Sequence, residues 1–411
     1  MSNETPGGFS RRRFLAATGA ASIGAASVAG GSPASAAQSP GSERTQAFYG
    51  AHQSGIATPA QSNVVLASFD LLSSRRHEVK TLLAAWTRAA ARLTQGKALI
   101  GESEGAPPAD TGEAIGLGPA QLSITLGFGP KFFDERLGWT HLAPASFSAL
   151  PSFPGDQLDE ASSEGDLCIQ ACANDAQVAF AAVHNLARMA EAVLILRSLQ
   201  SGFSRTSTTD AAQSSERNLL GFKDGTNNIM ASDKSALSRY VWVGDEAGQS
   251  WLKGGSYLVA RRMRLALEQW GRLSLPDQEA VIGRHRDSGA ALGAHREHDP
   301  VALELVGRHG GPVIPPDAHI RVAAPSSNDS TRILRRGYSF ADGIDPTTGQ
   351  LDAGLLFICF QRDPVKQFVA IQRRLAAHDA LQSYATTTRQ AVFACPRGLE
   401  PGESWGTWLP A

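Results

Sequence analysis

Apolar positions along the chain follow two spacings, one typical of strands and one typical of helices. Short apolar or alternating runs predict strands at residues 63–72, 121–129 and 166–175. Residues 77–96 and 176–193 carry apolar side chains at intervals of three and four, which predicts amphipathic helices. The first of these helical runs ends in a glycine, a common helix terminator.

The second half of the chain repeats this order of elements. Its pattern predicts strands at residues 254–267 and 354–363 and helices at residues 267–273 and 364–377. Strands and helices that recur in the same order are typical of an α+β fold built from two similar units.

A short match without gaps supports this duplication. At the same offsets the two units carry Asp175, Phe180, Ala182 and Val183, and Asp363, Phe368, Ala370 and Ile371. Each aspartate follows an apolar strand and stands where a helix N-cap belongs. Chance remains an alternative for so short a match. We expect one half at residues 46–215 and the other at residues 216–411.

The first 45 residues are expected to stand outside the fold. Arg11 and Arg12 precede an Ala-, Gly- and Ser-rich apolar stretch, and the small residues Ala34 to Ala36 suit a signal peptidase. This order predicts a twin-arginine signal cleaved near Ala36, with the twin-arginine translocase as export partner. A disordered basic tail is the alternative, and the stretch is too short and Gly-rich for a stable membrane span.

The export route bears on location and cofactor loading. Because the twin-arginine pathway carries folded proteins, a cofactor would be inserted in the cytoplasm. The mature protein is then expected outside the cytoplasm, in the periplasm, on the cell surface or secreted.

The net charge and the cysteines indicate which partners and which cysteine chemistry to expect. The formal net charge of the 411 residues is -1, so no nucleic-acid partner is implied. Cys168 and Cys172 lie four residues apart on a predicted strand, roughly 13 Å and too far for a disulfide. With Cys359 and Cys395 they are expected to be reduced core thiols. A structural disulfide is the minor alternative, and a metal site lacks the paired spacing that it needs.

The stretch GFKDGTNN, residues 221–228, is richer in turn residues than a tight turn needs. Its glycines tolerate positive φ angles, and they frame the carboxylate of Asp224. This combination marks a candidate site.

A histidine and an arginine further along the chain add to this candidate. His319 lies in PPDAHIRVAAP, where we expect the start of a short, rigid strand, and Arg335 follows the apolar Ile333 and Leu334. A buried arginine needs a charge partner or an anionic ligand. His319 alone would more often be a structural histidine, and the HREH run at residues 295–298 lacks further ligands at metal-binding spacing.

A haem pocket needs this set of groups. A neutral imidazole ligates the iron on one side. On the other side, breaking an O–O bond needs a proton-transferring group and a positive charge. The spacing of the residues is compatible with such a pocket but does not force it.

Four segments, taken together, resemble one known family. GFKDGTNN, DAHIRVAAP, ILRRGYSF and DAGLLFICFQRD are similar in sequence and order to motifs of the dye-decolorizing peroxidases. The resemblance covers about residues 50–410 and points to the twin-arginine-exported branch that includes the bacterial deferrochelatase/peroxidases. It implies two ferredoxin-like halves around one haem b per chain.

The resemblance also implies a role for each motif residue. His319 would be the proximal ligand of the haem iron, Asp224 the distal acid/base and Arg335 the distal arginine. Further contacts to the haem would come from Gly225, Thr226 and Asn227. Ala324, Pro325 and Ser326 stand where related sequences often read Asn-Pro-Arg, so one arginine for a haem propionate is missing here.

The implied activity is a peroxidase that uses hydrogen peroxide to oxidise dyes, phenols or similar one-electron donors. The alternatives are a deferrochelatase, which removes iron and leaves the porphyrin intact, and a non-catalytic haem carrier. Tyr338 and Trp242 could pass electrons from donors too large to enter the site, although ordinary packing explains aromatic residues more often. Whether the chain forms a homo-oligomer is left open.

Overall fold

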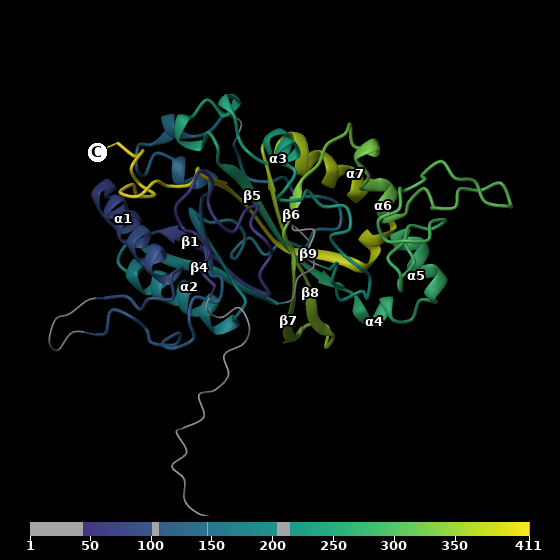
Figure 1. Cartoon of the computed structure of the whole chain (residues 1–411), viewed down its shortest axis with the longest axis horizontal. Coiled ribbons are helices and arrows are strands. Elements are labelled where there is room, and N and C mark those ends of the chain that lie inside the picture. The colour runs from purple at the N-terminus through teal and green to yellow at the C-terminus, as the bar shows by residue number, and fades with distance from the viewer. Residues whose placement is uncertain (1–43, 101–106, 146, 204–213, 411) are drawn as a thin grey trace, which may run out of the picture. The chain divides into compact units, whose positions relative to one another are not determined.

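The computed structural model describes residues 44–100, 107–145, 147–203 and 214–410 (Figure 1). The predicted twin-arginine signal and its cleavage site lie outside this part of the chain. Within it, no helix combines the length and the apolar composition that crossing a membrane requires.

The first half has the element order of a ferredoxin-like fold. It consists of β1 (Asn63–Leu71), α1 (Arg76–Leu93), β2 (Ser123–Phe128), β3 (Leu167–Ala173), α2 (Ala176–Ala190) and β4 (Leu194–Phe203). The strands form antiparallel ladders in the spatial order β2-β3-β1-β4. The two helices pack together, and the buried Trp86 of α1 donates to the Leu186 carbonyl of α2 at 2.8 Å.

The second half repeats this topology. Its strands are β5 (Ser256–Leu265), β7 (Tyr338–Ile344), β8 (Leu351–Gln361) and β9 (Ala385–Cys395), in the spatial order β9-β5-β8-β7. Helix α7 (Ala370–His378) stands between β8 and β9, as α2 stands between β3 and β4. The duplicated α+β architecture expected from the sequence is therefore confirmed.

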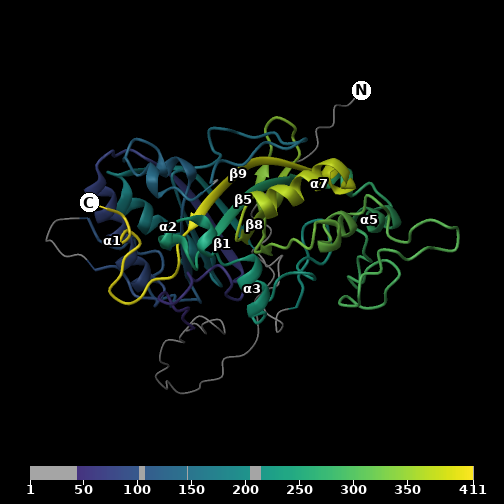
Figure 2. The same cartoon turned by 90° about the horizontal axis from the view of Figure 1, so that it is seen from above.

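One long insertion distinguishes the second half. Where the first half has the single helix α1, residues 266–337 form α4 (Leu267–Trp270), α5 (Leu275–Ile282), α6 (His319–Val322) and the short strand β6 (Leu334–Arg335). In both views α5 lies at the opposite end of the strands from α1 and α2 (Figures 1 and 2). Helix α3 (Lys234–Tyr240) precedes β5. The insertion carries two of the predicted site residues, His319 and Arg335.

The two sets of strands close on each other. β2 meets β9 at Phe128 and Ala394, β4 meets β7 at Phe203 and Ser339, and β5 pairs with β8. The eight long strands thus form a closed ring, called the barrel below, in which β2 and β4 each join the other half through a single residue pair. Its interior is apolar and includes Val64, Leu258, Ile358, Phe360 and Phe393.

The repeat found in the sequence has a structural role. Asp175 caps α2 by accepting from Gln177 N at 2.8 Å, and Asp363 accepts from Val365 N at 2.9 Å. Such caps typically contribute about 0.5–2 kcal/mol. The matched phenylalanines differ, because Phe368 is buried against β8 and β5 whereas Phe180 is exposed.

The cysteine prediction is confirmed for the described residues. Cys168, Cys172, Cys359 and Cys395 are all fully buried and form no disulfide with one another. Burial raises the pKa of the Cys168, Cys359 and Cys395 thiols, so these groups stay protonated and behave as small apolar side chains.

Candidate functional site

The loop at residues 221–228, called the distal loop below, holds Asp224 in a defined position. Gly221 and Gly225 adopt φ angles of +86° and +97°, which a side chain would strain, so glycine is needed on both sides of Asp224. The Asp224 amide donates to the Glu216 carbonyl at 3.0 Å. Asp224 Oδ1 accepts from Arg335 Nη1 at 2.6 Å, so the structure brings these two predicted residues together.

The alternation of side chains along β6 directs Arg335 toward the site. β6 pairs with β8, with Leu334 opposite Phe360 and Arg335 opposite Cys359. Because successive side chains of a strand point to opposite faces, Leu334 enters the barrel interior and Arg335 leaves on the outer face. The main chain of Arg335 is fixed by Asn228, whose side chain accepts from its N–H at 2.9 Å and donates to its carbonyl at 2.8 Å.

His319 begins a helix, so the prediction that it starts a strand is wrong. It is the first residue of the single helical turn α6, and its carbonyl accepts from Ala323 N at 2.9 Å. The apolar run after His319 is only a few residues long and ends near Pro325. Its alternation is too short to distinguish a strand from a helical turn.

The partner of His319 is Asp379, which no motif in the sequence indicated. His319 Nδ1 donates to Asp379 Oδ2 at 2.7 Å, and the side chain of Asp379 is fully buried. Burial alone would lower the pKa of His319, but the Asp379 carboxylate outweighs this effect and leaves the pKa above its ordinary value of 6.5. Asp379 also accepts from Leu381 N at 2.9 Å, so the turn after α7 fixes its orientation.

These contacts fit a haem iron site. With Nδ1 bonded to a carboxylate, Nε2 is the ring nitrogen left to bind iron, the arrangement usual for a metal-bound histidine. The side chains of His319, Arg335 and Asp224 retain 32%, 26% and 14% of their exposure, so all three can reach a ligand. The charges of Arg335 and Asp224 both act on the pKa of His319, so these two groups lie within electrostatic range of its ring.

The other residues that are predicted to contact the haem differ in burial. Gly225 is buried, Thr226 is half-buried and Asn227 is exposed, whereas the neighbouring Asn228 is buried and holds Arg335. Ala324, Pro325 and Ser326 lie at the helical turn that follows α6, and Ser326 is exposed. Their contacts to a haem remain predictions.

The second arginine of the Arg-Arg pair is the more deeply buried one. Arg336 is fully buried and donates to the Thr58 carbonyl at 2.6 Å and to the side chain of Gln61. It therefore joins the second half to the segment that precedes β1. The charge partner that the sequence predicted for Arg335 is Asp224.

The two candidate aromatic residues differ in exposure. Tyr338 is fully buried, and burial raises its pKa well above the ordinary value. Trp242 is half-buried and stacks on His52, with 3.7 Å between the ring centroids and 4° between the planes. A role for either residue in electron transfer remains a prediction.

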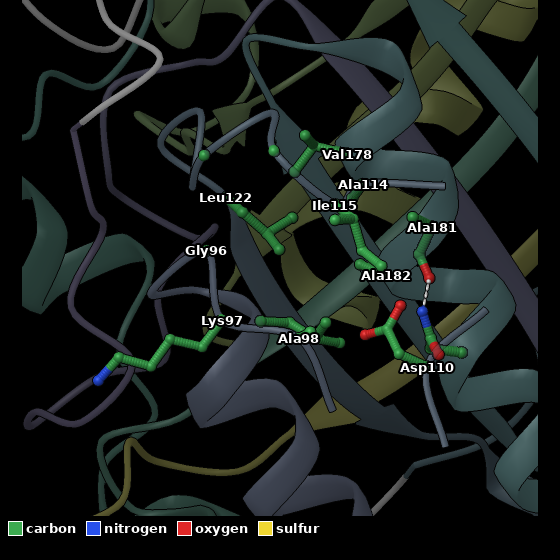
Figure 3. A pocket seen from close by; sticks show the side chains of 14 residues that line it. Gly96, Lys97, Ala98, Asp110, Ala114, Ile115, Leu122, Val178, Ala181 and Ala182 are labelled. Atoms are coloured by element: carbon green, nitrogen blue, oxygen red, sulfur yellow. Dashed lines mark hydrogen bonds between the residues drawn. The ribbon is translucent and has the colours of Figure 1, made fainter. Parts of the chain in front are cut away.

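A separate cavity lies in the first half and has no part in this site. It measures about 180 Å³ and is lined by α1, α2 and residues within 96–98 and 110–118. Figure 3 shows Asp110 at its wall and Lys97 directed away from it. Asp110 accepts from the Leu99 and Gly112 amides, and Asn185 bonds to Thr111 and Ala181. Ligand pockets are usually ~300–1,000 Å³, so we interpret this one as packing space.

The chain belongs to the Dyp-type peroxidase family. Residues 53–204 match the family model described as Dyp-type peroxidase, N-terminal, and residues 215–400 match the one described as Dyp-type peroxidase, C-terminal. Members of this family are haem-dependent peroxidases. The predicted family, the predicted enzyme class and a haem cofactor are therefore confirmed.

Individual relatives agree with this assignment. The deferrochelatase of Escherichia coli (strain K12) is 37% identical over 412 residues, which cover 96% of this chain and 95% of that protein. The structure of ferric DtpA from Streptomyces lividans is 37% identical, covers 90% of this chain and 98% of its own, and superposes with a TM-score of 0.82. A DyP-type peroxidase from Streptomyces coelicolor gives 38% identity, coverages of 92% and 99%, and a TM-score of 0.83.

Proposed function

We propose that the chain binds one haem b through His319 and reduces hydrogen peroxide with electrons from dyes, phenols or similar one-electron donors. The observation that carries this proposal is the ion pair between Asp224 and Arg335, whose charges both act on the pKa of His319. A peroxide-cleaving site needs a proton-transferring group beside a positive charge, and a carrier needs neither.

Each residue of the site has a separate role in the proposed reaction. When bound, the haem supplies an iron that coordinates peroxide and accepts the oxidising equivalents. His319 Nε2 would hold the iron, and Asp379 keeps the opposite N–H in place. Asp224 Oδ1 is engaged by Arg335, so Oδ2 is the oxygen that would take a proton from one peroxide oxygen and return it to the other. Arg335 stabilises the negative charge that builds on the departing oxygen.

A second candidate function is removal of iron from haem with the porphyrin left intact. Relatives that are 37% identical over most of the chain bear the name deferrochelatase, which favours this alternative. Product analysis distinguishes the two. Incubation with haem, peroxide and a phenol should give oxidised phenol and recoverable haem for a peroxidase, whereas metal-free protoporphyrin would identify a deferrochelatase.

The buried carboxylate Asp379 offers a test of the iron site. Replacement by asparagine keeps the shape and an oxygen for Leu381 N but removes the charge that orients His319. Losing such a partner usually costs about 10- to 100-fold in metal affinity or activity. We expect Asp379→Asn to show weaker haem binding and a changed absorption spectrum. Wild-type haem affinity and spectrum in Asp379→Asn would contradict this positioning role.

Export by the twin-arginine pathway is also part of the proposal. Replacing Arg11 and Arg12 by lysine should trap the precursor in the cytoplasm, folded and already loaded with haem. Fractionation of cells that express the wild type and the double variant measures this. Normal secretion of the double variant would show that another route carries the protein.

A further inference from the structure

One glutamate contacts the distal loop on both sides of Asp224. Glu297 Oε2 lies 2.6 Å from Lys223 Nζ, and Glu297 Oε1 accepts from Thr226 Oγ1 at 3.0 Å. Lys223 directly precedes Asp224, and Thr226 follows it by two residues. The side chain of Glu297 is only 13% exposed, so these contacts are largely shielded from solvent. A single carboxylate therefore spans the turn that presents Asp224.

The surrounding segment fits closely against the same loop. Gly289 has a φ of +76°, and a Cβ built there would lie 2.7 Å from Lys223 Cδ and 3.3 Å from Glu297 Cγ. Arg284 Nη1 donates to the carbonyls of Gly289 at 2.7 Å and of Glu297 at 3.3 Å, which fixes the main chain that carries the glutamate. Arg284 thus fixes the main chain of Glu297, and the Glu297 carboxylate contacts the distal loop.

The charge state of Glu297 agrees with this arrangement. Burial alone would raise the pKa of Glu297, but hydrogen bonds from Lys223, Ser215 and Thr226 leave it below the ordinary value of 4.5. The carboxylate is therefore ionised at neutral pH and retains both contacts. The HREH run, which did not fit a metal site, thus contains a residue with a structural task at the distal loop.

We propose that Glu297 is a positioning residue for the peroxide reaction. By holding the side chains of Lys223 and Thr226, it restrains the loop on both sides of Asp224 and so aims the Asp224 carboxylate beside Arg335. This inference rests on the proposed role of Asp224. Catalytic groups must stand close to their productive geometry, and a displacement of about 1 Å can cost about 100-fold in rate. Glu297 needs no contact with peroxide to affect the reaction.

The primary test compares two glutamates of the same protein. Glu297→Gln removes the charge at the distal loop, and Glu403→Gln removes a charge that pairs with Arg397 in the C-terminal segment. With haem-loaded proteins, we expect Glu297→Gln to slow the reaction with peroxide by about 10- to 100-fold. Glu403→Gln should keep the wild-type rate. Equal rates for wild type and Glu297→Gln would overturn the proposal.

A second readout follows the loop itself and needs no turnover. Amide hydrogen exchange over residues 221–228 should become faster in Glu297→Gln and remain unchanged in Glu403→Gln. If Glu297→Gln does not fold, Thr226→Val removes one of the two contacts and should give a smaller change in the same direction. Unchanged exchange of the loop in a folded variant would contradict the positioning role.

A double variant separates positioning from general stability. If Glu297 acts only through Asp224, adding Glu297→Gln to Asp224→Asn should change the peroxide rate by less than about twofold. A further large loss in the double variant would show that Glu297 acts by another route, which overturns the inference. If Asp224→Asn alone reacts as fast as wild type, the proposed role of Asp224 fails. The single variant therefore distinguishes a failure of the proposed function from a failure of the inference about Glu297.

Discussion

His319→Ala is expected to abolish stable haem binding, the largest effect of any single substitution in this protein. The imidazole provides the one predicted bond from the chain to the iron, and alanine has no atom that can replace it. The ratio of haem to protein after purification, together with the absorption spectrum, measures this directly. His295→Ala and His298→Ala are suitable controls, since His298 is 69% exposed and neither residue is predicted to bind the iron.

Loss of His319 has a second consequence that needs its own control. Asp379 is fully buried and its Oδ2 would lose the donor that His319 provides, which typically costs about 1–3 kcal/mol or more for a charged group. His319→Ala/Asp379→Asn removes this buried charge and should recover much of the stability without recovering haem. Wild-type haem content and spectrum in folded His319→Ala would exclude His319 as the iron ligand.

Arg335→Leu and Asp224→Asn are expected to retain haem but to react slowly with peroxide. Acid–base catalysis typically contributes ~10²–10⁴-fold, and one electrostatic donor ~10²–10³-fold. We expect the larger loss from Arg335→Leu, because a water molecule can relay a proton but cannot supply a fixed positive charge. The leucine variant should fold, since Asn228 holds residue 335 by its main chain.

Stopped-flow mixing of the ferric protein with peroxide measures this step without a reducing donor. The rate of the absorbance change is compared among wild type, Asp224→Asn and Arg335→Leu at equal haem content. Wild-type rates in both variants would show that the distal roles assigned to these residues are wrong.

The sequence predicted the elements whose periodicity is long and consistent. β1, α1, β3, α2 and β8 were expected within a few residues of their observed bounds, because each has a sustained apolar pattern. β4, β6, β7 and β9 were missed. β4 and β9 carry polar residues in their central parts, which interrupt the apolar pattern. Two of these, Arg197 and Gln390, donate to the carbonyls of Ser163 and Pro151.

The site was predictable only in part. The motifs indicated Asp224, Arg335 and His319, and the ion pair between the first two is now observed. Asp379 stands 60 residues beyond His319, and only the packing of α6 beside α7 brings them together. Glu297 was likewise hidden, because its contacts to the distal loop depend on the path of the long insertion. Local sequence patterns do not show which residues from distant parts of the chain come into contact.

The most direct test is the absorption spectrum of the purified wild-type protein before and after one equivalent of hydrogen peroxide. We expect a ferric haem spectrum that changes within the mixing time and returns to its starting form when a phenol is added. A protein without a haem spectrum would contradict the iron site at His319. A haem spectrum that peroxide leaves unchanged would contradict the peroxidase and favour a haem carrier.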